Sequence, residues 1–131
     1  MKSWPMSKRI DWNQTKQIWE TTPNVIAVWA FGSAKGGQVG TDSDVDIAVL
    51  MESSPTLDER LELLSRLQGA LQVEEIDLVV LNEANAIVRF EAISGQSLFC
   101  RDLARRAEFA SLTAREYEDE IAFWQRALQD T

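Results

Sequence analysis

Three aspartates stand in segments of the chain that are otherwise apolar. Asp44 and Asp46 lie two residues apart at the start of residues 44–51, and Asp77 is the one charged residue of 76–81. Residues two apart in a strand share a face, and a neighbouring strand would bring the third carboxylate beside them. Two unit charges about 4 Å apart repel by roughly 4 kcal/mol at an effective dielectric of about 20. Such a cluster shares protons or binds a cation, and all-oxygen ligands favour Mg²⁺ or Mn²⁺ over zinc or copper.

A plainer interpretation of the same residues involves no metal. Asp44 would cap a turn, and Asp77 would mark the end of a strand. For one aspartate alone this explanation serves as well as a metal site. For three together the metal site is favoured, because an unpaired buried charge is so costly.

A glycine-rich segment precedes the paired aspartates. Gly32-Ser33 directly follows the apolar run 25–31, and three more glycines come before residue 41. Backbone N–H groups at such a turn, with the Ser33 hydroxyl, can cradle a phosphate, and glycine lets phosphate oxygens approach the backbone. Neither the P-loop pattern nor G-x-G-x-x-G is present. Taken by itself, the segment fits a plain hairpin loop equally well.

The residue inventory excludes several kinds of chemistry. The 131 residues include no histidine and one cysteine, Cys100, which excludes Ser-His-Asp and Cys-His catalysis, ordinary zinc enzymes and an internal disulfide. With 21 acidic and 13 basic residues the net charge is −8, so we expect no direct binding of nucleic acid and a better match to a basic protein partner. No signal peptide or membrane-length apolar run is visible. We therefore expect a cytoplasmic protein without membrane association.

The candidate residues must be positioned by a small fold, which we expect to be a single domain over residues 1–131. The apolar pattern predicts strands at 25–31, 44–51, 76–81 and, at an edge, 97–100, and helices at about 12–21, from Thr56, at about 84–94 and from Asp102. Thr56 and Glu59 have the spacing of a capping box, and Gly95 suits the position after a helix. This order favours an α/β (α+β) domain: a small mixed β-sheet flanked by helices, with a long C-terminal helix.

The expected C-terminal helix has a regular apolar stripe. Its apolar positions alternate steps of four and three residues: Leu103, Ala107, Ala110, Ala114, Tyr117, Ile121, Trp124 and Leu128. A break near Thr113 is compatible with the pattern. The acidic run 116–120 is either a solvated face or a surface for a basic partner, and Arg101, Arg105 and Arg106 have the same two interpretations.

Together these segments resemble the minimal nucleotidyltransferases, the MNT family of the DNA polymerase β superfamily. The specific parts are FGS, TDSDVDIAVL and EIDLVVL: Gly32-Ser33, ten residues, Asp44-Val45-Asp46, and then Asp77 on the next expected strand. The likeness covers nearly the whole chain and implies a nucleotidyltransferase fold. It is greatest to family members that act as antitoxins paired with HEPN-domain toxins.

The resemblance implies a role for each motif residue. Gly32 and Ser33 would hold a nucleoside triphosphate, and Asp44 and Asp46 would coordinate Mg²⁺ or Mn²⁺ with its phosphates. Asp77 would complete the metal site and help to deprotonate the attacking hydroxyl. The three aspartates would thus be both catalytic and metal-binding.

The segment after Gly32-Ser33 departs from the family pattern. Relatives often carry arginines there, whereas this chain has Ala34-Lys35-Gly36-Gly37. Lys35 is thus the cation of this segment available to contact phosphate. Affinity for the nucleotide would then be modest, or a partner would supply positive charge.

The resemblance favours an antitoxin that transfers AMP from ATP to a tyrosine hydroxyl of a cognate HEPN ribonuclease toxin, within a hetero-oligomer, and so neutralises it. One alternative is a small-molecule nucleotidyltransferase of the aminoglycoside-modifying kind, which usually adds a substrate-binding domain. A second alternative is an antitoxin that only masks its toxin. The intact acidic triad argues against that second alternative.

Overall fold

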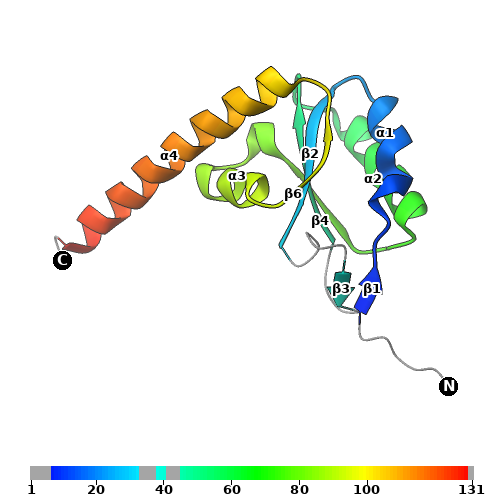
Figure 1. The fold of residues 1–131 in the computed structure, drawn as a ribbon, viewed down its shortest axis with the longest axis horizontal. Coiled ribbons are helices and arrows are strands. Elements are labelled where there is room, and N and C mark those ends of the chain that lie inside the picture. Colours follow the sequence, from blue (N-terminus) through cyan, green and yellow to red (C-terminus); the bar gives the residue numbers. More distant parts are fainter. Residues whose placement is uncertain (1–6, 33–37, 41–44, 130–131) are drawn as a thin grey trace.

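The computed structural model describes residues 7–32, 38–40 and 45–129, arranged as a sheet with helices on both faces and one long helix leading away (Figure 1). In chain order the elements are β1 (Ser7–Arg9), the 3-10 turn η1 (Trp12–Thr15), α1 (Lys16–Glu20), β2 (Val25–Phe31), β3 (Gln38–Gly40), β4 (Val45–Met51), α2 (Leu57–Leu71), β5 (Ile76–Val80), the 3-10 turn η3 (Leu81–Glu83), α3 (Ala86–Ile93), β6 (Gln96–Cys100) and α4 (Leu103–Gln129). The expected α/β class, mixed sheet and long last helix are confirmed.

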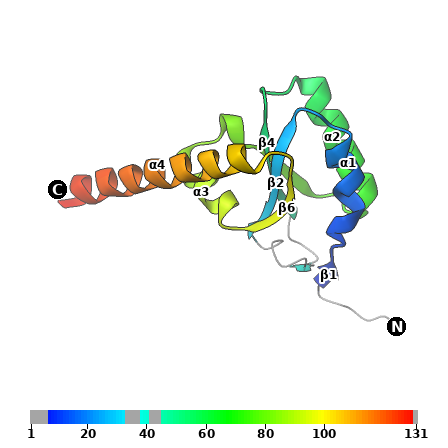
Figure 2. The same cartoon turned by 45° about the horizontal axis from the view of Figure 1, so that its top comes forward.

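The main sheet has four described strands in the order β5-β4-β2-β6. Strand β2 is antiparallel to both β4 and β6, while β4 and β5 run parallel. A separate antiparallel pair joins β1 to β3, below the main sheet in Figure 2. The sequence analysis predicted neither of these two strands, since each has three residues and no apolar alternation marks them.

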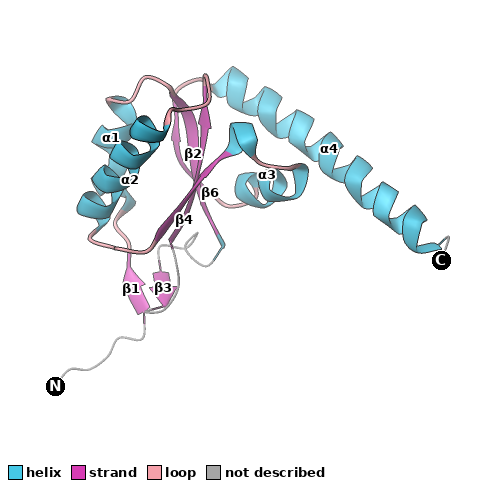
Figure 3. Cartoon of the chain, turned by 180° about the vertical axis from the view of Figure 1, so that it is seen from behind, coloured by secondary structure: helices cyan, strands magenta, loops and turns pink. Residues whose placement is uncertain are grey.

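The helices cover the sheet unequally. Helices α1 and α2 lie on one face, and α3 with the start of α4 lies on the other (Figure 3). Strand β2 is buried at every position, as its continuous apolar run predicted. Trp19 of α1 is fully buried and its indole Nε1 donates to Thr15 Oγ1 at 3.0 Å, so this tryptophan belongs to the core.

Helix boundaries confirm some local signals and correct others. Thr56 and Glu59 form the predicted capping box at the start of α2. The helix expected at about 12–21 is a 3-10 turn followed by the five residues of α1, with Asp11 capping the turn by accepting from Asn13 N. Helix α4 continues through Thr113 without a break, because the Thr113 side chain is buried against the body of the protein.

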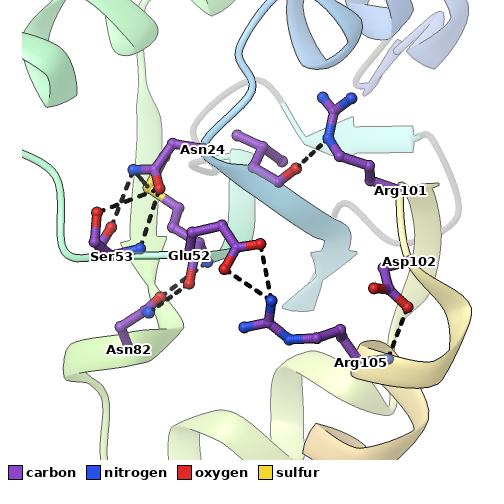
Figure 4. A network of polar contacts seen from close by, with 9 residues as sticks. Asn24, Glu52, Ser53, Asn82, Arg101, Asp102 and Arg105 are labelled. Carbon is purple, nitrogen blue, oxygen red and sulfur yellow. Dashed lines mark hydrogen bonds and ion pairs between the residues drawn. The ribbon is translucent and has the colours of Figure 1, made fainter.

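A polar network fixes the strand ends and the start of α4 (Figure 4). The Asn82 side chain donates to Met51 O at 2.7 Å and accepts from Met51 N at 3.0 Å, and Asn24 bonds both backbone groups of Ser53. Arg105 of α4 donates to both carboxylate oxygens of Glu52, at 2.7 and 2.8 Å. This hydrogen bond raises the pKa of the Arg105 guanidinium. The start of α4 is thereby tied to the end of β4.

Candidate functional site

Asp46 and Asp77 lie side by side on neighbouring strands. In the parallel pairing of β4 with β5, Asp46 is the register partner of Asp77, and on its other side Asp46 is the partner of Phe31, the last residue of β2. Strands in a sheet are about 4.8 Å apart. The strands of Asp46 and Asp77 are therefore neighbours, which is the condition under which their carboxylates were expected to converge.

The two aspartates also share a face of the sheet. Asp46 alternates along β4 with Ile47 and Val49, which belong to the core beneath α2, so its side chain points to the α3 side. Asp77 alternates in the same way with Ile76 and Leu78, which pack against that same core. The carboxylates therefore form one acidic site on the α3 face.

Burial of this site is less than expected. Asp77 is exposed and Asp46 is half-buried, so the expectation of costly buried charge is wrong for Asp77. Strand β5 ends the described sheet order, which leaves the Asp77 side chain open to solvent. What still requires compensation is the repulsion between adjacent carboxylates.

Gly32 packs against the Asp46 carboxylate. Its backbone has φ +64, and a Cβ at this position would lie 2.5 Å from Oδ2 of Asp46. From the sequence, glycine is expected here because it lets a phosphate approach the backbone. The structure adds a second requirement, because any side chain would also displace a carboxylate of the site.

Gly95 packs closely against the end of β2, a role that no sequence pattern indicates. It follows α3 as expected, but Gly32 is the glycine with positive φ among the described residues, so Gly95 is no left-handed cap. A Cβ at Gly95 would overlap the carbonyl oxygen of Ala30 and come 3.0 Å from the Cβ of Phe31. The connection between α3 and β6 thus packs closely against the end of β2, beside Gly32.

Three of the sequence-predicted site residues, Ser33, Lys35 and Asp44, lie outside the described residues. Among the side chains that the structure describes, no group of three His, Cys, Asp or Glu residues could hold a metal ion. The predicted triad of aspartates includes Asp44, which lies outside the described residues. The triad is therefore not tested by this absence. Gly32, Asp46 and Asp77 are the predicted site residues that the structure brings together.

The described part of the site has the chemistry of a hard-cation site. Two adjacent carboxylates supply oxygen ligands, which suit Mg²⁺ or Mn²⁺. The half-exposed position leaves room for water and for phosphate oxygens, with which Mg²⁺ usually completes its coordination. These donors therefore fit the expected ion.

The three arginines near the start of α4 make contacts within the chain. Arg101 donates to the carbonyl oxygens of Val25 at 2.8 Å and Trp19 at 2.7 Å, Arg105 pairs with Glu52, and Arg106 donates to Ser97 Oγ at 2.8 Å. No local sequence signal identifies these partners, because the acceptors of Arg101 lie more than 70 residues away. Arg101 is thus a structural residue.

Two cavities are lined by described residues, and neither includes Asp46 or Asp77. The first, of about 250 Å³, lies at the opposite end of β2, between Pro23 and Arg66 of α2. The second, of about 380 Å³, lies between Trp29, Gly95 and Arg106.

The sequence matches the family described as Polymerase beta, Nucleotidyltransferase over residues 13–104. This match covers more than half of the chain and includes Gly32, Asp46 and Asp77. The chain therefore belongs to the polymerase β nucleotidyltransferase family.

Several solved structures share the fold. The crystal structure of a toxin–antitoxin with AMP-PNP matches at 26% identity and a TM-score of 0.77, over 92% of this chain and 98% of that one. The toxin–antitoxin MntA–HepT matches at 26% identity and a TM-score of 0.67, over 90% and 95% of the two chains. A complex of tri-AMPylated HEPN toxin with MNT antitoxin, from Shewanella oneidensis, matches at 26% identity and a TM-score of 0.68, over 90% and 94%.

No curated protein matches the chain. None of the helices that the structure describes is both long enough and apolar enough to cross a membrane.

Proposed function

We propose that this chain is the antitoxin of a toxin–antitoxin pair, and that it transfers AMP from ATP to a tyrosine hydroxyl of a HEPN toxin. The observation that carries this proposal is the pairing of Asp46 with Asp77 beside Gly32, within a fold shared along almost its whole length with the MNT antitoxin of an AMPylated complex. The AMP-PNP complex supports ATP as the nucleotide. A cytoplasmic location would suit such a pair.

In the proposed reaction, the acceptor oxygen bonds to the α-phosphorus of ATP while the bond from that phosphorus to the bridging oxygen breaks. Pyrophosphate leaves, and the proton of the acceptor hydroxyl passes to the Asp77 carboxylate. A tyrosine hydroxyl has a pKa of about 10, so it needs a base at neutral pH. The chain has no histidine, and the exposed Asp77 can reach a hydroxyl that arrives from solvent.

Asp46, with Asp44 and Asp77, would hold Mg²⁺ or Mn²⁺. The ion would neutralise phosphate charge in the transition state, which is the largest need of phosphoryl transfer. Asp46 and Asp77 also repel ATP when no cation is present. Nucleotide binding should therefore depend on the divalent ion.

The phosphates would lie at the end of β2. Gly32 begins the segment there, and a glycine lets a phosphate oxygen approach the backbone. Ser33 would donate its hydroxyl and Lys35 its charge. These two roles rest on the family resemblance, because both residues lie outside the described part of the chain.

The open position of Asp77 favours an acceptor carried by a macromolecule. A hydroxyl on the surface of a partner protein can reach an exposed carboxylate directly.

The test is transfer of label from α-³²P-ATP to purified HEPN toxin in the presence of Mg²⁺. Labelling of the toxin by the wild-type protein, lost with EDTA and lost in Asp46→Asn, supports the proposal. A toxin that is bound and inhibited without incorporating label would favour the masking antitoxin instead.

A further inference from the structure

Large apolar side chains are exposed in the outer half of α4. Phe123 and Trp124 are 56% and 55% exposed, although both are large aromatic side chains. Exposed apolar side chains gathered on one segment mark a contact surface more often than chance. The shape and the charges of this surface indicate which binding partner it fits.

Helix α4 is attached to the body through its inner half. Phe109 lies 6.4 Å from Trp29 between ring centroids, Tyr117 stacks on Phe90 at 4.0 Å, and Thr113 between them is buried. Toward its C-terminal end, α4 leads away from the sheet (Figures 1 and 3). The projecting part, Glu118 to Gln129, is about 18 Å long.

The apolar stripe lies beside the contact with the body and continues past it. Its members alternate steps of four and three residues, which is the a/d spacing of a coiled coil. Tyr117 and Trp124 occupy d positions and Ile121 an a position, whereas Phe123 stands off the stripe. An α-helix turns about 100° per residue, so this spacing keeps the stripe on one side of α4. The complementary shape is another helix.

The charges beside the stripe select the kind of helix. In the projecting half the flanking e and g positions are Glu118, Glu120, Gln125 and Ala127, and the two beside Ile121 are acidic. These positions set partner choice in helix pairs through interhelical ion pairs. The projecting half of a second copy of α4 would bring no basic side chain at these positions to pair with Glu118 and Glu120. A partner helix with Lys or Arg beside its apolar face would instead form ion pairs.

The projecting half also needs support. An isolated helix of fewer than about 12–15 residues is marginal in water. The ring contact of Phe123 with Trp124 and the hydrogen bond of the Trp124 indole both lie within α4: the ring centroids are 5.5 Å apart, and the indole donates to Glu120 Oε1 at 3.1 Å. Burying one such aromatic side chain removes about 150–250 Å² from water. A partner that covers the stripe would stabilise these turns.

We propose that the outer half of α4, centred on Ile121 and Trp124, is the surface on which the chain docks an amphipathic helix of its toxin, one whose apolar face is flanked by basic residues. This inference rests on the proposed function for the identity of the partner. It adds a contact surface that is separate from Asp46 and Asp77. Docking there would hold the toxin while its tyrosine reaches the acidic site.

The experiment measures toxin binding by isothermal titration for two matched pairs of variants of the full chain. Trp124→Ala is compared with Phe123→Ala, an adjacent aromatic of equal exposure that stands off the stripe. Glu118→Lys is compared with Asp119→Lys, which makes the same charge change on the side of α4 opposite the stripe. We expect Trp124→Ala and Glu118→Lys to weaken binding at least tenfold, and each matched control to weaken it less than threefold.

Equal affinities within each pair would overturn the docking surface. So would sedimentation that shows a dimer of this chain broken by Trp124→Ala with toxin binding unchanged, since a second copy would then be the occupant. Transfer of AMP is measured in parallel. Toxin that binds through the stripe but gains no AMP leaves the surface standing and refutes the proposed function. Toxin that gains AMP equally with Trp124→Ala and Phe123→Ala refutes the surface alone.

Discussion

The backbone of Gly32 packs directly on the carboxylate of Asp46, so that a Cβ at Gly32 would lie 2.5 Å from Oδ2 of Asp46. Glycine is required here by conformation as well, because φ is +64 and a left-handed conformation costs an L-residue about 1–2 kcal/mol. The phosphate end of the site and its acidic end are thus coupled through one contact.

Gly32→Ala should lower the free energy of unfolding by about 1–2 kcal/mol and reduce AMP transfer on the order of 100-fold, because the displaced Asp46 loses its place in the site. Urea denaturation and a transfer assay measure the two effects. Gly69→Ala in α2 is the control: nothing lies within 4 Å of its Cβ, and it should leave activity unchanged and stability equal or higher. Full activity in Gly32→Ala would show that the contact is unimportant.

Asp46→Asn should abolish transfer while the fold persists. The change keeps the size of the side chain and removes the charge that would bind the metal, so the fold should persist and transfer should be lost. Differential scanning calorimetry and the transfer assay test both parts, with Asp119→Asn, on the exposed side of α4, as the control. Turnover at the wild-type rate would refute the metal-binding assignment of Asp46.

Asp77→Asn should lower kcat by roughly 10²–10⁴-fold and weaken ATP binding less than Asp46→Asn does, since Asp77 is assigned to the acceptor hydroxyl as well as to the metal site. Single-turnover kinetics and ATP titration separate the two quantities. Glu75→Gln removes a charge two residues away, from an exposed side chain, and should change kcat little. A loss of ATP affinity with unchanged kcat would show that Asp77 binds the nucleotide and does not act as the base.

Arg101→Met should destabilise the fold by roughly 2 kcal/mol. The arginine donates to the carbonyl oxygens of Val25 and Trp19 and lies over the Phe99 ring, whereas methionine keeps the apolar stem and removes the donors. Arg115→Met, at an exposed position of α4, should cost far less. Equal denaturation midpoints for the two variants would contradict the structural role of Arg101.

Sequence patterns predicted the strands that have continuous apolar runs, and they missed the two strands that are three residues long. The all-apolar run of β2 and the capping box at Thr56 follow from local chemistry, so both were predictable. Strands β1 and β3 are three residues each and are fixed by their pairing, which no local pattern records. The α1 region was predicted as one helix because its apolar spacing does not distinguish a 3-10 turn from an α-helical turn.

The placement of the candidate residues was predictable in part, and their environment was not. Asp46 and Asp77 were expected to meet, and the parallel register of β4 with β5 brings them together. The exposure of Asp77 was not predictable, because it depends on β5 lying at the end of the sheet order. The contact between Gly32 and Asp46 also escaped prediction, since it joins the residue that follows β2 to a residue of β4.

The central claim is that this chain transfers AMP to a tyrosine of its toxin. Intact-mass spectrometry of the toxin, after incubation with this chain, ATP and Mg²⁺, tests it most directly. The account predicts a mass gain of one or more AMP units, located on tyrosine by peptide mapping and absent with Asp46→Asn. An unmodified toxin, together with AMP transferred to an added aminoglycoside in the same reaction, would contradict it.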